Sequence, residues 1–277
     1  MYDIFPNYVL RPFYPPQHGV PGSSQRKGVR NSTGTAFYVD QEHPKADDNN
    51  KGWDAEFPLE TIQAAIDKAE DFDWVVVMPG FYVEELVIDK PLTLLGNGRG
   101  GASVIFADIA DSVGITIQDD YVTIMNMMIV AVDVGVFIDD ANNAQFHNCR
   151  FNASDDHVHI DGNNILFREC VFWGGENGIA FVDDSANIVV KDCLFSNISD
   201  AHIVDGTAEV LRLTVKDCVF EGSPTKFLDI DTAGTTGIVA NCAIAHATNA
   251  TDVIDLAAGV MWVANYTEAG VTAARPT

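Results

Sequence analysis

Basic side chains are scarce in this sequence. The 277 residues contain 16 Lys and Arg against 40 Asp and Glu, which gives a formal net charge of −24. The deficit is uneven, because residues 1–35 hold four cations and a single acid and therefore carry a positive charge. The rest of the chain is acidic enough to repel the phosphate backbone of DNA and RNA. We therefore expect no nucleic acid partner.

Long apolar runs are missing as well. No stretch approaches the 18 or so uninterrupted apolar residues that favour a transmembrane helix, so we expect no membrane span. Residues 1–11 lack the basic start and apolar segment of a secretory signal, which favours synthesis in a cytoplasm. The five cysteines are an odd number, and we expect them to be reduced core residues rather than a disulfide framework.

A short pattern recurs six times between residues 122 and 244. Apolar residues stand three before and two after each anchor, and Asn, Asp or Glu stands just before it. The anchors follow one another at intervals of 21 to 25 residues and are Met127, Cys149, Cys170, Cys193, Cys218 and Cys242. A self-similar period in the twenties is typical of a solenoid.

The spacing inside the pattern indicates the kind of solenoid. Apolar residues alternate with the two-residue period of a strand that is buried on one face. The phase slips by one residue before the anchor, so the chain must turn a corner where Asn and Asp tolerate left-handed backbone. This is one coil of a parallel β-helix, with coils stacked about 4.8 Å apart. A leucine-rich repeat has a similar period, but its L-x-x-L-x-L pattern is absent.

Residues 1–35 predict an extended arm, because five prolines exclude a helix. The arm is too rich in apolar and basic side chains for an idle linker. Its candidate docking residues are Phe5, Tyr8, Arg11, Phe13, Tyr14, Arg26, Lys27 and Arg30. Two interpretations remain open: the arm packs along its own body, or it docks onto a partner or a neighbouring subunit.

We assign residues 36–268 to the coils. Pro58 begins a helical pattern that runs to about residue 70, and we expect this helix to cover the open strand edges at the start of the solenoid. Met261 and Val263 predict a last rung, and coiling should end near Tyr266 because Glu268 would bring a charge into the core. Residues 269–277 form a short tail.

Several segments before the repeat resemble the first coils of right-handed parallel β-helix proteins of the pectate-lyase-like superfamily. They are Phe37–Asp40, Asp47–Gly52, Pro58–Ile66, Val75–Glu84 and Lys90–Gly96. The resemblance extends over about residues 36–265. It implies an all-β, single-stranded, right-handed parallel β-helix of about eight or nine coils, with an N-terminal capping helix and arm. The superfamily contains polysaccharide lyases and hydrolases as well as phage tailspikes and other virion proteins.

One stretch offers candidate catalytic residues. If Val158 and Ile160 point inward, then His157, His159 and Asp161 point outward at intervals of about 7 Å, and Asp139 from the preceding coil could join them. A histidine with paired carboxylates can serve acid–base hydrolysis. However, the Asn-Thr-Asp, Gly-His-Gly and Arg-Ile-Lys motifs of polygalacturonase-like hydrolases are missing. A solvated polar face explains the same residues.

Acidic pairs recur where strands end. Asp119-Asp120, Asp139-Asp140 and Asp183-Asp184 could bind structural Ca²⁺, although Asp also favours turns for local reasons. We favour solvated turns and therefore expect no metal-binding residues and no cofactor, with structural Ca²⁺ as the alternative.

The resemblance leaves two classes of function open. Because the catalytic motifs are missing and the arm is basic, we expect a structural virion protein, a homotrimeric capsid-decoration or spike subunit bound through residues 1–35 to a capsid or other virion protein. The alternatives are a polysaccharide hydrolase or lyase, and a non-catalytic module that binds a surface glycan. For the last of these, Phe137 and Trp173 are the clearest outward aromatic candidates.

Overall fold

The computed structural model describes residues 34–98, 102–108, 112–245 and 254–267. The arm candidates Phe5, Tyr8, Arg11, Phe13, Tyr14, Arg26, Lys27 and Arg30 lie outside the described residues, as does the expected tail 269–277.

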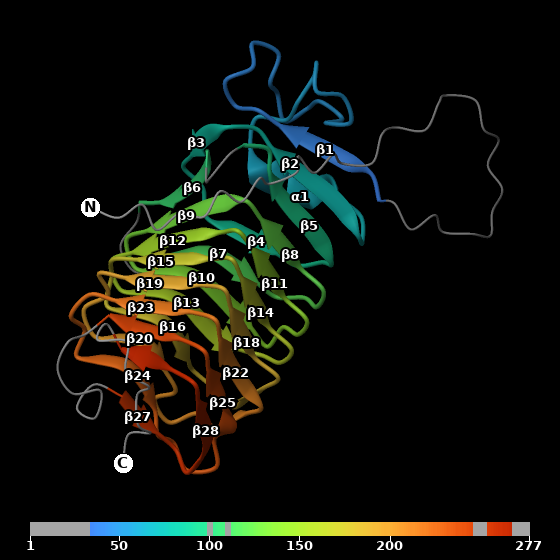
Figure 1. The fold of residues 1–277 in the computed structure, drawn as a ribbon. Coiled ribbons are helices and arrows are strands. Elements are labelled where there is room, and N and C mark those ends of the chain that lie inside the picture. Colours follow the sequence, from blue (N-terminus) through green and yellow to red (C-terminus); the bar gives the residue numbers. More distant parts are fainter. Residues whose placement is uncertain (1–33, 99–101, 109–111, 246–253, 268–277) are drawn as a thin grey trace.

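Three parallel sheets wind around one core, and each coil contributes one strand to each sheet in turn (Figure 1). Sheet A contains β1 (Ala36–Val39), β2 (Asp73–Val77), β5 (Leu92–Gly96), β8 (Thr123–Met125), β11 (Gln145–His147), β14 (Leu166–Arg168), β18 (Val189–Lys191), β22 (Leu213–Lys216), β25 (Thr236–Ala240) and β28 (Gly259–Val263). Sheet B contains β3 (Gly80–Tyr82), β6 (Ser103–Ala107), β9 (Met127–Ala131), β12 (Arg150–Ala153), β15 (Val171–Trp173), β19 (Leu194–Ser196), β23 (Val219–Glu221), β26 (Ala243–Ala245) and β29 (Tyr266–Thr267).

Sheet C contains β4 (Leu86–Ile88), β7 (Val113–Ile117), β10 (Val134–Asp139), β13 (Asp156–Asp161), β16 (Asn177–Phe181), β20 (Ala201–Val204), β24 (Lys226–Ile230) and β27 (Ile254–Leu256). A small fourth sheet pairs β17 (Ser185–Ala186) with β21 (Val210–Leu211). The prediction of an all-β parallel β-helix is confirmed.

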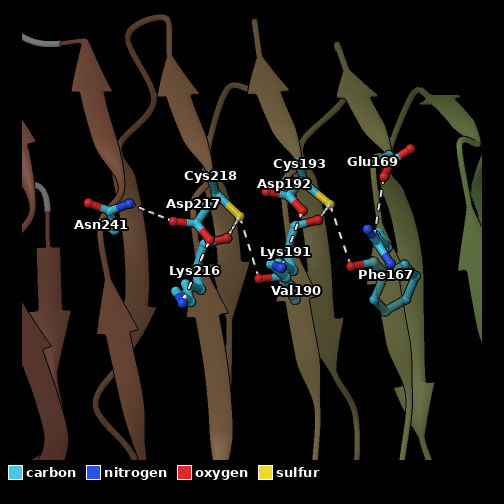
Figure 2. Close-up of polar contacts among 11 residues, drawn as sticks. Phe167, Glu169, Val190, Lys191, Asp192, Cys193, Lys216, Asp217, Cys218 and Asn241 are labelled. Carbon is cyan, nitrogen blue, oxygen red and sulfur yellow. Dashed lines mark hydrogen bonds and ion pairs between the residues drawn. The ribbon is translucent and has the colours of Figure 1, made fainter. Parts of the chain in front are cut away.

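The corner between sheets A and B is formed by the residue just before each anchor. All six of these residues have left-handed backbone, with φ between 52° and 59°: Asn126, Asn148, Glu169, Asp192, Asp217 and Asn241. Neighbouring corners are joined by side chains, since the Asn148 Nδ2 donates to the Asn126 Oδ1 at 2.9 Å. The Asn241 Nδ2 donates likewise to the Asp217 Oδ1 at 2.6 Å (Figure 2). The phase slip in the sequence is therefore a real turn of the chain.

The anchors and their apolar neighbours fill the core as columns. The five cysteines are free and buried, and the Cys218 Sγ donates to the Val190 carbonyl at 3.5 Å (Figure 2). Burial raises the pKa of the Cys170 thiol well above its ordinary value, so this thiol is protonated and unreactive. Beside the cysteines, Phe172 stacks on Phe195 with ring centroids 4.5 Å apart. The expected reduced cysteine column is confirmed as a packing element.

Helix α1 (Ile62–Lys68) lies at the start of the solenoid and buries Ile62, Ala65 and Ile66. It begins later than Pro58, where the sequence pattern placed its start. The reason is that Leu59 extends the sheet edge, donating its N–H to the Tyr38 carbonyl at 2.9 Å. Thr61 then becomes the N-cap, and its hydroxyl accepts from the Ala64 N–H at 3.3 Å.

The predicted phase of the last rung is wrong by one residue. Val239 lies opposite Trp262 in the sheet, so Val260 is buried while Met261 and Val263 are 60% and 45% exposed. The anchor position is taken by Asn265, a fully buried polar residue. Its side-chain amide is satisfied, because Oδ1 accepts from the Cys242 N–H at 2.8 Å and Nδ2 donates to the Val239 carbonyl at 2.9 Å.

The described part of the chain contains no helix long and apolar enough to cross a membrane. The absence of a nucleic acid partner stays a prediction.

The corner at Glu169 predicts a stabilising substitution. Left-handed backbone is energetically less favourable for Glu than for Asn. Glu169→Asn should therefore raise the free energy of unfolding by about 1 kcal/mol, measured by urea denaturation. The 3.2 Å ion pair between Arg168 and Glu169 is solvent-exposed, so its loss should cost little. The matched variant Asp192→Asn, at an equivalent corner, should change stability by less than about 0.5 kcal/mol. Equal effects at both corners would contradict the argument.

Candidate functional site

A histidine and an aspartate meet on the outer face of sheet C. The Nε2 of His159 lies 2.6 Å from the Oδ2 of Asp156, and both side chains are partly buried. Burial opposes ionisation of Asp156, but hydrogen bonds from His159 and Asn177 outweigh it and lower the pKa of the carboxyl. An ionised carboxylate only accepts hydrogen bonds, so the Nε2 of His159 is the donor in this contact. Phe137 from the preceding coil stands edge-on to this imidazole, with ring centroids 6.2 Å apart.

Two carboxylates lie farther along the same face. Asp139 and Asp161 are direct neighbours in the register of β10 and β13. The pKa of Asp161 is raised by partial desolvation and by the charges of Asp183, Asp140 and Asp139. The structure therefore brings three of the four sequence candidates, His159, Asp161 and Asp139, to one face. Asp156 is the fourth member, and it reaches His159 because β13 departs from strict alternation at its start, where three consecutive residues are buried.

His157 does not belong to this site, and its expected outward orientation is wrong. Its side chain is fully buried, its ring packs edge-on against Phe172 at 6.0 Å, and its Nε2 lies 3.2 Å from the Trp173 carbonyl. The imidazole fits inside because the neighbouring coil carries Gly178 at the same position. Burial lowers the pKa of His157 to about 4, so it is neutral at pH 7.

His202 is a second buried histidine, which sequence reasoning missed. Its ring lies beside the stacked pair Phe195 and Phe220, nearly parallel to both, with centroids 5.8 and 5.6 Å away, and neither ring nitrogen has a hydrogen-bond partner in the described part of the chain. Burial lowers its pKa to about 3. A signal was available, because Phe227 takes the same position one coil later. The repeat position of His202 therefore indicates a core residue.

Two of the three predicted acidic pairs accept hydrogen bonds from backbone amides of the next coil. The Asp120 Oδ1 accepts from the Asn142 N–H at 2.8 Å, and the Asp184 Oδ1 accepts from the Glu209 N–H at 2.7 Å. These contacts join one coil to the next. A tighter acidic group, Asp229, Asp231 and Asp255, lies near the C-terminal end of sheet C, where the Lys226 ammonium pairs with Asp255. Structural Ca²⁺ stays an untested alternative to the predicted solvated turns.

A family of known proteins matches most of the solenoid. The family described as "Right handed beta helix region" matches residues 94–255. The chain belongs to this right-handed β-helix family. The handedness expected from the sequence is thereby confirmed. No curated protein sequence matches the chain.

Solved structures with the same architecture come from carbohydrate-active enzymes. A pectin methylesterase from Aspergillus niger superposes with a TM-score of 0.63 at 16% identity, covering 90% of each chain. The carrot pectin methylesterase gives 0.62 at 14% identity, covering 91% of this chain and 86% of the other. The pectate lyase Pel9A gives 0.61 at 13% identity, covering 87% and 81%. At such identities the likeness shows the fold alone.

The two buried histidines predict an acid-sensitive fold. In the unfolded chain a histidine has a pKa of about 6.5, so below that pH the unfolded state binds protons that the folded state excludes. The stability contributed by neutral His157 is therefore lost as pH falls from about 6.5 towards 4, by up to about 3 kcal/mol. The loss for His202 continues towards pH 3.

The variant His202→Phe isolates one of these groups. Phenylalanine takes the equivalent position in the next coil, so the variant should fold and should lose stability less steeply below pH 6.5 than the natural chain. The measurement is urea unfolding between about pH 4 and pH 7. Val189→Phe, a change on the outer face of sheet A that alters no titratable group, serves as the control and should leave the slope unchanged. Parallel curves for the natural chain and His202→Phe would disprove the assignment.

Proposed function

We propose that the protein is a structural subunit of a virus particle, a β-helical capsid-decoration or spike protein. In this proposal several copies associate, as a trimer, and residues 1–35 attach each copy to a capsid or other virion protein. The observation that carries the proposal is the contrast between the two parts of the chain. An acidic solenoid follows a segment that is basic, rich in proline and rich in apolar side chains.

The chemistry of the solenoid supports this reading. On sheet C, the Lys226 ammonium is paired with Asp255, and the Asp156 Oδ2 accepts from His159, while the buried Asp156 Oδ1 has no hydrogen-bond partner among the described residues. A lyase of this fold needs a strong base, and Lys226 is engaged in its ion pair. The cysteine thiols are core residues. The solenoid thus supplies a rigid body. Because this body is acidic, an acidic partner would repel it, and the positive charge of the arm provides the attraction.

Deleting residues 1–33 tests the proposal. The truncated protein should keep its β-rich circular dichroism spectrum and its unfolding midpoint, because the described coils form one continuous core. It should no longer cosediment with virus particles in a density gradient. The companion variant, with Arg11, Arg26, Lys27 and Arg30 all changed to Gln, keeps the apolar side chains and tests the charge separately. Normal incorporation of the truncated protein would refute the proposal.

A second candidate rests on the 2.6 Å contact between Asp156 and His159. A carboxylate that orients an imidazole is the arrangement of a general base, and the face could therefore serve a polysaccharide hydrolase or lyase. Without chemistry, the same face with Phe137 would suit a surface glycan that stacks on an aromatic ring.

Polysaccharide turnover distinguishes the two candidates. Incubation with acidic and neutral polysaccharides should release neither reducing ends nor unsaturated products if the role is structural. If products do form, His159→Ala should lower the rate by about 10²-fold or more, while His147→Ala on sheet A should not change it. Such a pattern would replace the structural proposal with the enzymatic one.

A further inference from the structure

A second corner of the coils, where the chain passes from sheet C into sheet A, has its own column of left-handed residues. Extending the register of sheet A backwards by one or two residues aligns one residue from each successive coil. These residues are Phe72, Pro91, Tyr121, Asn143, Asn164, Asn187 and Arg212. All except Pro91 have φ between 59° and 66°. We call them the C–A corner column.

The later part of the C–A corner column is polar, and the fold explains it. Asn tolerates left-handed backbone better than most residues. The Asn187 Nδ2 donates to the Asn164 Oδ1 at 2.8 Å, and the Arg212 Nε donates in turn to the Asn187 Oδ1. These side chains join one coil to the next, as they do at the corner between sheets A and B.

Phe72 and Tyr121 depart from this pattern. Left-handed backbone is strongly disfavoured for bulky side chains, and burial of the ring could offset that cost. However, Phe72 is 57% exposed and Tyr121 is 56% exposed. Neither backbone preference nor packing against the described residues therefore explains an aromatic side chain at these two positions. Exposed rings held in an unfavourable backbone conformation indicate a contact surface.

The arm joins the solenoid at this same column. The Thr35 N–H donates to the Asp73 Oδ1 at 2.6 Å, and the register of β1 with β2 places Gly34 directly over Phe72. The approach is so close that a Cβ on Gly34 would collide with the Phe72 carbonyl oxygen. The chain before Gly34 therefore enters the solenoid beside Phe72.

The spacing of the coils matches the reach of the arm. Figure 1 shows β1, β2, β5 and β8 stacked in this order. Three coil spacings of about 4.8 Å separate Gly34 from Tyr121, which makes about 14 Å. An extended chain spans about 3.3 Å per residue, so Arg30, four residues before Gly34, reaches about 13 Å. An arm that runs along this corner thus brings Arg30 level with Tyr121.

The acids beside the C–A corner column complement the charge of the arm. Asp71 directly precedes Phe72 and is exposed, and the pair Asp119-Asp120 directly precedes Tyr121. A guanidinium can stack on an aromatic ring and pair with a carboxylate at the same time. Tyr121 and the acids beside it offer Arg30 both kinds of contact.

We infer that residues 29–33 bind this corner of their own solenoid, with Arg30 against the Tyr121 ring and residues 31–33 passing Phe72. The segment is covalently joined at Gly34, so its local concentration at the corner far exceeds that of the same segment on another copy. Residues 1–28 stay available for a partner. The inference does not rest on the proposed virion role, because the contact lies within one chain.

Tryptic cleavage after Arg30 in the full chain tests the inference, with the products followed by mass spectrometry. A bound segment is cut only when it opens, so Tyr121→Asn should raise the rate of cleavage after Arg30 by about 10-fold or more. The control is Tyr266→Asn, the same substitution at a tyrosine in the last coil that is 43% exposed. This control should leave the rate unchanged.

The urea midpoint separates release of the arm from a weakened solenoid. Tyr121→Asn introduces the residue type that the next three coils carry at this position, so the midpoint should stay equal or rise. Faster cleavage with an undiminished midpoint supports the inference. Faster cleavage with a lower midpoint would assign Tyr121 a purely structural role and overturn it.

Dilution identifies the chain that supplies the segment. Protection of Arg30 by its own solenoid should be unchanged over about a hundredfold dilution. Protection that falls on dilution would assign the bound segment to a second copy, and equal cleavage of the natural chain and Tyr121→Asn would reject the contact; either result overturns the inference. Cosedimentation with particles is a separate measurement, so the virion role can fail while protection of Arg30 stands, and the reverse.

Discussion

The fold depends on one backbone constraint: a left-handed residue at the same place in every coil. Without it, the apolar side chains of the strands on either side could not all point inward, because the two strands are out of phase by one residue. Six residues from Asn126 to Asn241 supply this conformation with φ near +55°, and Ala264 repeats it in the last coil. Once the corner is fixed, the cysteine and phenylalanine columns fall into register and each coil becomes a template for the next.

Much of this could be predicted from the sequence, because a repeated pattern reports the same constraint six times. The corner residues, the buried cysteines and the parallel register all follow from that repetition. The errors lie where a position is occupied by an unusual residue type. His157, Gly178, His202 and Phe227 occupy equivalent positions in successive coils. That this position faces the core becomes visible only after the coils are aligned. Asn265 likewise replaces a cysteine, and its hydrogen bonds to the neighbouring coil cannot be read from composition.

The candidate site was only partly predictable for a related reason. Strand periodicity correctly placed His159, Asp161 and Asp139 outward, but it failed for His157, where three consecutive residues of β13 are buried. The partnership of His159 with Asp156 depends on side-chain geometry at the start of that strand.

The stacking of equivalent coils also means that the number of coils, and with it the length of the solenoid, can change while the other parts of the molecule stay the same. The helix α1 covers one end, the first strand connects to the arm, and the coils between β8 and β25 contact chiefly the coil before and the coil after. Adding or removing one whole coil of some twenty residues would lengthen or shorten the rod by about 4.8 Å, without redesigning the helix, the arm or the side faces. The length of such a solenoid can therefore change in steps of one coil. A closed globular core cannot be lengthened in this way.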